Sequence, residues 1–131
     1  MSGGRGGGPY IKKTVAGPRY PFADVVGVFK LAALHKARAI TPVKDLLGVG
    51  DPQAEGYIRK SLRSLTEGNY VESVELDFDD PVDADVYGLR NKEGDWYVKF
   101  FVAHGQVTVV SFHPPKWDFT CRNGLLIRAG R

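Results

Sequence analysis

The stretch DWYVKFFVAHGQVTVVSFHPP, residues 95–115, decides the fold of this chain. Polar and apolar side chains alternate on both sides of Gly105, which is typical of two antiparallel strands joined by a short turn. Two prolines follow His113 and end the second strand, because proline cannot donate a backbone hydrogen bond. The segment therefore predicts a β-hairpin, and its register determines which side chains share a face.

Two registers of this hairpin are open. A two-residue turn at His104-Gly105 would place Trp96 opposite His113 and bring polar groups into the apolar face. A three-residue loop centred on Gly105 would place Tyr97 opposite His113 instead. Because a one-residue slip moves every side chain to the other face, the register that separates polar from apolar residues is favoured. We therefore expect the three-residue loop.

The favoured register defines two faces. The apolar face would collect Trp96, Val98, Phe100, Val102, Thr108, Val110 and Phe112. The second face would carry the cross-strand pairs Tyr97–His113, Lys99–Ser111 and Phe101–Val109. In the preceding hairpin, the NKEG loop at residues 91–94 would pair Arg90 with Asp95, which puts Gly88 opposite Tyr97. That register would leave open space beside the phenol.

Helical patterns precede this sheet. Apolar residues recur every three or four positions over residues 22–37, which predicts an amphipathic helix. Thr41 and Asp51 can each N-cap a helix, and each is followed by a proline suited to the first helical position. We therefore expect a short helix over residues 43–47 and a longer one that ends at about Glu67.

After Gly68 the apolar period changes to two. The expected strands cover residues 70–76, 86–90, 95–103 and 107–113. Helices followed by consecutive strands predict an α+β fold, in which the helices, residues 22–67, pack on one face of an antiparallel sheet, residues 70–113.

A chain of 131 residues suits a single domain. The glycine-rich residues 1–18 have little apolar surface to offset the entropy of ordering them, so we expect a flexible tail there. The folded domain would cover residues 19–131, with residues 117–131 as a C-terminal extension beyond the last predicted strand.

Composition excludes several classes of protein. The single cysteine, Cys121, excludes an internal disulfide framework and a multi-cysteine zinc site, and it favours a cytoplasmic location. No apolar stretch approaches the roughly 20 residues that span a bilayer. The phosphate-loop, HExxH and GxSxG motifs are also absent from the sequence. The net charge of +3 favours an anionic partner.

The polar face of the hairpin brings together residues that can act on a phosphodiester. His113 can exchange a proton near neutral pH, while Lys99 and Tyr97 can hold a phosphate oxygen. Glu72 shares a side of the first strand with apolar residues, so this carboxylate is expected to be paired or functional. The structural alternative is that these are ordinary cross-strand neighbours on a solvated face. The sequence predicts no metal site.

Arg59, Lys60 and Arg63 lie beside the apolar stripe of the longest predicted helix. A solvated basic face is the default interpretation, and a contact with RNA phosphates or an acidic protein is the functional one. A DNA-reading helix would need a helix-turn-helix pattern, which this segment lacks.

The segment SLTEGNYVESVELDFDDPVDADVYGLRNKEGDWYVKFFVAHGQVTVVSFHPP, residues 64–115, resembles the C-terminal half of the MqsR toxins. The shared features are LTE before the first strand, DVY at 85–87, a G-x-x-Y-x-K run at 94–99, a histidine before the next turn, and SF at 111–112. MqsR toxins are the ribonuclease halves of MqsR–MqsA toxin–antitoxin pairs.

The resemblance implies a RelE-like fold, with helices on a curved antiparallel sheet as in barnase. It also implies a toxin that cleaves single-stranded mRNA without a metal or other cofactor. The ribose 2′-OH would attack the adjacent phosphate and leave a 2′,3′-cyclic phosphate and a 5′-OH end. A separate antitoxin protein would bind and neutralise the toxin.

The resemblance also assigns site residues. Tyr97 matches the family's active-site tyrosine, and His113 stands at the position of a lysine on the last strand. Glu72 replaces the family's lysine on the first strand, and Ala84 replaces its glutamine before DVY. Our hypothesis is an acid–base pair of Glu72 and His113, as in barnase-like ribonucleases, which requires both to face one cleft with Lys99 or Arg90 near the phosphate. The alternative is a catalytically inactive module of the same fold that binds RNA or an acidic protein.

Overall fold

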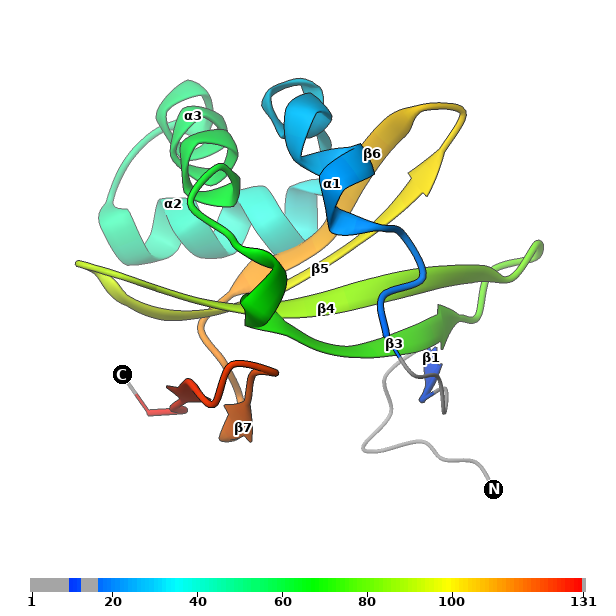
Figure 1. Ribbon diagram of the computed structural model, residues 1–131. Helices are drawn as coiled ribbons and strands as arrows, with labels where there is room; N and C mark the ends of the chain where they lie inside the picture. The colour runs from blue at the N-terminus through cyan, green and yellow to red at the C-terminus, as the bar shows by residue number, and fades with distance from the viewer. Residues whose placement is uncertain (1–9, 13–16, 131) are drawn as a thin grey trace.

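The computed structural model describes residues 10–12 and 17–130 of the chain. It is an α+β structure in which the helices lie on one side of a twisted sheet and a small hairpin lies on the other side (Figure 1). The sheet has six strands in the order β1-β3-β4-β5-β6-β2. The strands are β1 (Tyr10–Lys12), β2 (Ala33–Leu34), β3 (Tyr70–Leu76), β4 (Val82–Asn91), β5 (Gly94–Ala103) and β6 (Gln106–His113).

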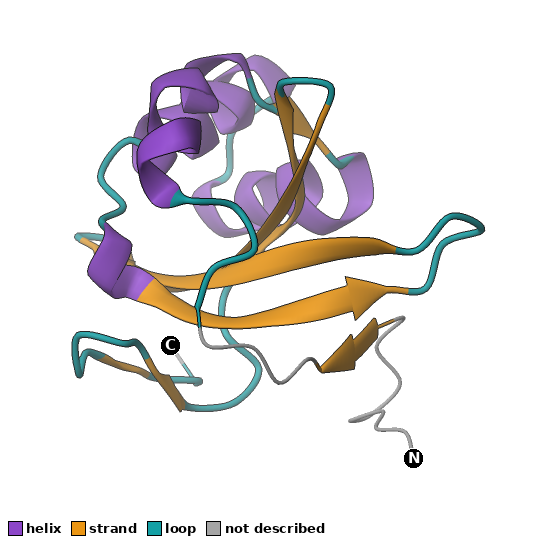
Figure 2. Ribbon diagram, turned by 45° about the vertical axis from the view of Figure 1, so that its right-hand side comes forward, coloured by secondary structure: helices purple, strands orange, loops and turns teal. Residues whose placement is uncertain are grey.

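The helical layer covers one face of β4, β5 and β6 (Figure 2). Its elements are α1 (Phe22–Val25), a 3-10 helix (Val26–Leu31), a π-helical turn (Lys36–Ile40), α2 (Thr41–Leu47), α3 (Asp51–Leu62) and a short 3-10 turn (Glu67–Asn69). The α+β class and the helices on one face agree with the sequence-based expectation.

The expected continuous helix over residues 22–37 is wrong. The helical path ends at Leu31, and Ala33–Leu34 becomes strand β2, which pairs in parallel with Thr108–Val109 of β6. Valines and Gly27 dominate the first turns and are poor helix formers, while the extended segment gains backbone pairing at a sheet edge. The parallel β2 makes the sheet mixed, although β3 to β6 form an antiparallel meander as expected.

The helix starts use other side chains than expected. Neither Thr41 nor Asp51 caps a helix with its side chain. His35 does so instead, because its Nδ1 accepts a hydrogen bond from the backbone N–H of Arg38 at 3.1 Å. The Asp51 carboxylate forms ion pairs with Lys36 and Lys44, and these tie the start of α3 to the π-helical turn and to α2.

The N-terminal segment differs in part from the expected flexible tail. Tyr10–Lys12 forms β1, which pairs antiparallel with the end of β3. Residues 1–9 and 13–16 lie outside the described residues. Further along, α3 ends at Leu62 and not near Glu67, although Leu65 still packs in the core.

The turn of the last hairpin is the two-residue one. His104 and Gly105 have φ of 54° and 75°, and two successive positive φ values suit the turn type that matches the twist of a hairpin. The expected three-residue loop is therefore wrong at this end. The pairs nearest the turn are Ala103–Gln106, Val102–Val107, Phe101–Thr108 and Phe100–Val109.

A β-bulge restores the expected register at the other end of the hairpin. The register shifts between Lys99 and Phe100, so that Val110 is an extra residue on β6. Lys99 then pairs with Ser111 and, two residues on, Tyr97 pairs with His113, as the sequence predicts.

The bulge also decides which valines of β6 reach the helices. Val107 and Val109 pack in the core on the helical side, where Thr108 and Val110 were expected. Val110 packs on the opposite face. The expected pair of Phe101 with Val109 is wrong for the same reason.

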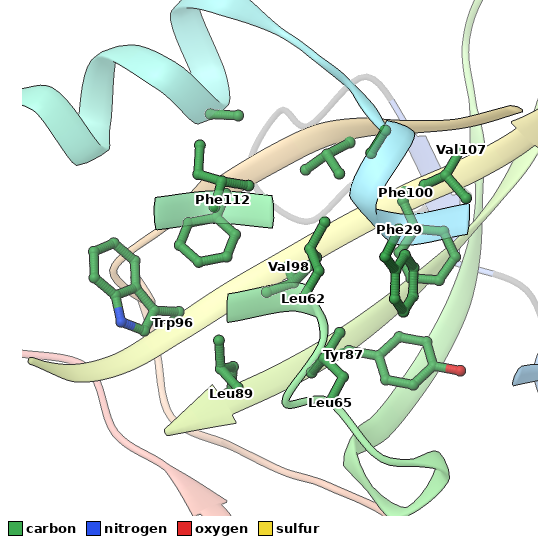
Figure 3. Close-up of a cluster of buried hydrophobic side chains, with 14 of the residues drawn as sticks. Phe29, Leu62, Leu65, Tyr87, Leu89, Trp96, Val98, Phe100, Val107 and Phe112 are labelled. Atoms are coloured by element: carbon green, nitrogen blue, oxygen red, sulfur yellow. The ribbon is translucent and has the colours of Figure 1, made fainter. Parts of the chain in front are cut away.

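Each face of the sheet carries its own apolar cluster. The larger one lies under the helices and includes Leu62 of α3; within it Phe29 packs edge-to-face with Phe100, and Trp96 packs against Phe112 (Figure 3). The smaller one lies on the opposite face and consists of Val74, Leu76, Ala84, Val86, Tyr97 and Val110. Because both faces are covered, most of β4 and β5 is buried.

A C-terminal hairpin covers part of the second face. It consists of β7 (Phe119–Thr120) and β8 (Leu126–Ile127), and it lies on the side of the sheet away from the helices (Figure 1). A Cβ atom added at Gly88 would lie 2.5 Å from Ile127, 2.8 Å from Cys121 and 2.9 Å from Phe119. The expected open space beside Gly88 is therefore filled by the extension.

Candidate functional site

The predicted site residues lie in two neighbouring rows across the second face. One row runs from Glu72 on β3 through Val86 and Lys99 to Ser111 on β6. The next row runs from Gly88 through Tyr97 to His113. Lys99 and His113 are diagonal neighbours on adjacent strands, within reach of long side chains.

His113 is held by a ring contact and a backbone contact. Its imidazole stacks on the Tyr97 ring at 5.1 Å between centroids and 16° between planes. Its Nδ1 lies 2.8 Å from the carbonyl oxygen of Pro114. Because a carbonyl oxygen only accepts, Nδ1 carries the proton, and the Nε2 lone pair of the neutral ring can take up another.

The electrostatic surroundings keep this imidazole neutral. Burial lowers the pKa of His113 below its ordinary value, and the positive charges of Lys116, Lys99 and Arg38 lower it further. The hydrogen bond with the Pro114 carbonyl acts in the opposite direction. A neutral imidazole, whose Nε2 carries a lone pair, has the protonation state of a general base.

Lys99 is a buried cation, with 3% of its surface exposed. Burial lowers its pKa to about 8, and the charges of Arg38 and Lys116 also lower it, whereas the carboxylate of Glu72 raises it. Its Nζ lies 5.8 Å from the centroid of the Tyr97 ring. A lysine with such a pKa can give up a proton near neutral pH.

Arg38 and Lys116 are two members of this site that sequence analysis missed. Arg38 comes from the π-helical turn beside the edge of β6, and its position depends on the unexpected break before that turn. Lys116 follows the two prolines after β6. The position of Lys116 directly after the last predicted strand is a sequence signal for its place near His113. No sequence signal indicates the place of Arg38.

The proposed pairing of Glu72 with His113 is not supported by the geometry. Both lie on one face, as the hypothesis required, but β4 and β5 separate their strands. Three strand spacings place their backbones roughly 14 Å apart, with Lys99 on the strand next to His113. Glu72 therefore acts on Lys99, by favouring its charged form, and Lys99 is the group nearer to His113.

Arg90 has a structural partner on the second face. Its guanidinium forms two hydrogen bonds with the carboxylate of Asp95, at 2.6 and 2.8 Å, and a third with the Leu126 carbonyl at 2.7 Å. Asp95 also accepts the backbone N–H of Arg128 at 2.8 Å. This pair therefore fixes the C-terminal hairpin to the sheet.

The basic residues of α3 lie in the helical layer, on the other side of the sheet from His113. Arg59 donates two hydrogen bonds, at 3.2 and 3.0 Å, to the Ala32 carbonyl at the break before β2. Lys60 and Arg63 are exposed. The structure does not bring these three residues together with Tyr97 and His113.

The C-terminal segment also shapes the surroundings of Tyr97. Trp117 and Phe119 each pack on Tyr97 in a T-shaped arrangement, with 6.2 and 5.9 Å between ring centroids. Only 6% of Tyr97 is exposed, whereas Trp117 is 42% exposed. His113, which stacks on Tyr97, is partly buried.

Within the described residues, no group of His, Cys, Asp or Glu side chains is placed to hold a metal ion. No helix in that part of the chain is long and apolar enough to cross a membrane. Comparisons of the chain with models of protein families, with curated proteins and with solved structures found no match.

Proposed function

We propose that this chain is a cytoplasmic, MqsR-like toxin with a RelE-like fold, acting as a metal-independent endoribonuclease on single-stranded mRNA. The observation that carries the proposal is the state of His113. Its ring is stacked on Tyr97, its Nδ1–H is fixed by the Pro114 carbonyl, and positive side chains surround it. The resemblance of residues 64–115 to the toxin family and the helices on one face of the β3–β6 meander support the same conclusion.

His113 supplies the base of the proposed reaction. Its Nε2 removes the proton of a ribose 2′-OH, and the oxygen attacks the adjacent phosphorus. Tyr97 holds the imidazole plane in place through the stacking contact. A neutral histidine performs this step better than a charged one, so the lowered pKa of His113 suits this role.

Lys99 supplies the charge and the second proton. Its ammonium stabilises the negative charge that develops on the phosphate and protonates the departing 5′-oxygen. The P–O5′ bond breaks, which leaves a 2′,3′-cyclic phosphate and a 5′-OH end. Glu72 favours the charged form of Lys99 and takes no direct part in the reaction. A separate antitoxin of acidic surface would suit the cationic site.

The test is cleavage of a mixed-sequence single-stranded RNA in EDTA by the purified chain, with end-group analysis of the products. We expect cyclic-phosphate ends, and at least a 100-fold loss of rate in His113→Ala, the scale of losing a general base. The matched control is His104→Ala, which removes an exposed histidine from the turn at the other end of the same hairpin. Equal activity of the two variants would reject His113 as the base.

One observation favours a catalytically silent module that binds RNA or an acidic protein. Tyr97 and Lys99 are 6% and 3% exposed, so the chain itself covers most of both side chains. The cleavage experiment separates the two functions when it is combined with binding of an RNA that cannot be cleaved. Binding by the wild type without cleavage would support the silent module.

A further inference from the structure

We propose that Trp117, Lys116 and Arg38 form a nucleotide-binding subsite, in which one base of a single-stranded RNA stacks on the indole and the adjacent phosphate lies on the two cations. The inference rests on the proposed function for its placement, since the subsite borders His113. It adds the part of the molecule that would hold the substrate strand. None of these residues belongs to the segment that resembles the toxin family.

The first observation is the position of Trp117. Its ring centroid lies 6.2 Å from that of Tyr97, with 62° between the two planes, and the Tyr97 and His113 rings stack at 5.1 Å between centroids. The indole nevertheless remains 42% exposed. An indole that packs on Tyr97 and keeps this much exposed surface offers an aromatic contact for a nucleobase next to the proposed general base, His113.

The second observation is the convergence of cations from separate elements. Lys116 directly precedes Trp117, and Arg38 lies in the π-helical turn that packs against β6, the strand of His113. The charges of both residues also lower the pKa of Lys99 and of His113. Both side chains are exposed at the surface. Like charges that gather at one place repel one another, and a bound anion relieves the repulsion.

These two features together match single-stranded nucleic acid better than either feature alone. A nucleobase can stack on a side chain only when a face of the nucleobase is free. The phosphates on either side of the nucleobase favour positively charged side chains. Bases in a duplex are already stacked on one another. We therefore expect preference for single strands over duplexes.

A second exposed aromatic residue gives a contrast. Phe78 is 44% exposed and contacts Phe101 edge-on at 6.3 Å, so its exposure and packing resemble those of Trp117. It lies in the sequence Asp77-Phe78-Asp79-Asp80, where the neighbouring carboxylates would repel a phosphate. Phe78 therefore serves as the matched control.

The two tryptophans allow a direct measurement. Trp96 is fully buried and Trp117 is exposed, so quenching of indole emission by a bound strand reports on Trp117. The ligand is a mixed-sequence single-stranded 2′-O-methyl RNA, which cannot be cleaved by 2′-OH attack. Binding is therefore measured independently of catalysis. Inorganic tripolyphosphate serves as a ligand that has charge but no bases.

We expect the single strand to quench emission and tripolyphosphate to leave it unchanged. Trp117→Ala should weaken binding about tenfold, the scale of one lost base stack, and Phe78→Ala should not change it. Lys116→Ala and Arg38→Ala should each weaken binding and reduce the slope of log affinity against log salt by about one. Trp117→Phe, which keeps an aromatic face and the contact with Tyr97, should bind more tightly than Trp117→Ala.

Equal affinities of Trp117→Ala and Phe78→Ala, or equal binding of a duplex, would overturn the subsite. The thermal midpoint and the emission of Trp96 establish that Trp117→Ala is folded. If the wild type binds and quenches as expected but cleaves no RNA, the subsite stands and the catalytic proposal fails. If His113→Ala abolishes cleavage but Trp117→Ala binds normally, the reverse holds.

Discussion

In the proposed reaction, His113 would be inactivated by a fall in pH and Lys99 by a rise in pH. The pKa of His113 is lowered mainly by burial, so its base form is present at neutral pH and is lost as the pH falls through a value below 6.5. Lys99 has its pKa lowered to about 8, so its acid form is lost as the pH rises through that value. Both groups are in the required state between these two limits.

We therefore predict a bell-shaped pH dependence of the cleavage rate, with an acid limb below pH 6.5 and an alkaline limb near pH 8. Lys99→Arg should lower the rate and remove the alkaline limb, because a guanidinium stays charged across this range and is a poor proton donor. The measurement is the rate under single-turnover conditions over pH 5–10. An alkaline limb unchanged in Lys99→Arg would show that another group is the acid.

The burial of Lys99 also predicts an effect on stability. A lysine with a pKa below its ordinary 10.5 is destabilising in its charged form, and this cost is full below about pH 8. Replacing it with methionine, which has a similar shape without the charge, should increase the free energy of unfolding at pH 7 by about 1–3 kcal/mol while cleavage is lost.

The sign of this effect can be checked with pH. As the pH rises from about 8 towards 10.5, the folded protein loses the buried charge before the unfolded chain does, so the wild type gains stability. The advantage of Lys99→Met in urea unfolding should therefore shrink between pH 7 and pH 9.5. A variant less stable than the wild type at both pH values would make Lys99 a structural residue.

At the scale of elements, the last hairpin depends on its turn. His104 occupies a left-handed conformation at φ 54°, which costs histidine more than it costs glycine or asparagine. His104→Asn should therefore raise the free energy of unfolding by about 0.5–1 kcal/mol and leave cleavage unchanged.

The neighbouring position provides the opposite result. Gly105 has φ 75°, so Gly105→Ala should lower the stability by about 1 kcal/mol. Thermal unfolding of both variants checks the pair. Changes of the same sign in both would mean that the turn adopts a different conformation.

This hairpin also shows what the sequence could predict. Alternation predicted Tyr97 opposite His113 and Lys99 opposite Ser111, because the register that separates polar from apolar residues is favoured wherever one face is buried. Alternation could not reveal the bulge at Val110, since one extra valine fits either face of a sheet that is apolar on both sides. One hairpin therefore contains both registers, the one of the two-residue turn up to Phe100 and the one expected for the three-residue loop from Lys99 to Tyr97.

The helical half was predicted less well. The spacing of residues 22–37 fits a helix, but the pairing of Ala33–Leu34 with β6 is a long-range interaction that local periodicity does not contain. Arg38 reached the site only through that change of path. The site residues on β5 and β6 were predicted because register alone positions them.

At the scale of the whole molecule, the second face is completed by the C-terminal hairpin. The Gly88 position admits no side chain, since a Cβ atom there would lie 2.5 Å from Ile127 and 2.8 Å from Cys121. Gly88→Ala should displace the hairpin and lower the stability by about 1–3 kcal/mol. Cys121 is the only thiol in the sequence, so faster reaction with a thiol reagent reports the displacement.

Gly56→Ala is the matched control for this substitution. Gly56 is exposed on α3, and nothing lies within 4 Å of an added Cβ atom, so the alanine should raise stability by about 0.5–1 kcal/mol without changing thiol reactivity. Unaltered thiol reactivity in Gly88→Ala would show that the sheet accommodates the methyl group without moving the hairpin.

The C-terminal hairpin also gives the molecule a way to loosen its site without global unfolding. The hairpin has two strands of two residues each, and it is fixed to β4 and β5 through Arg90, Asp95 and the close packing at Gly88. Small elements of this kind can open locally while the core, here the one under the helices, stays folded. Tyr97 would then lose its contact with Phe119, so the ring on which His113 stacks would be held less firmly.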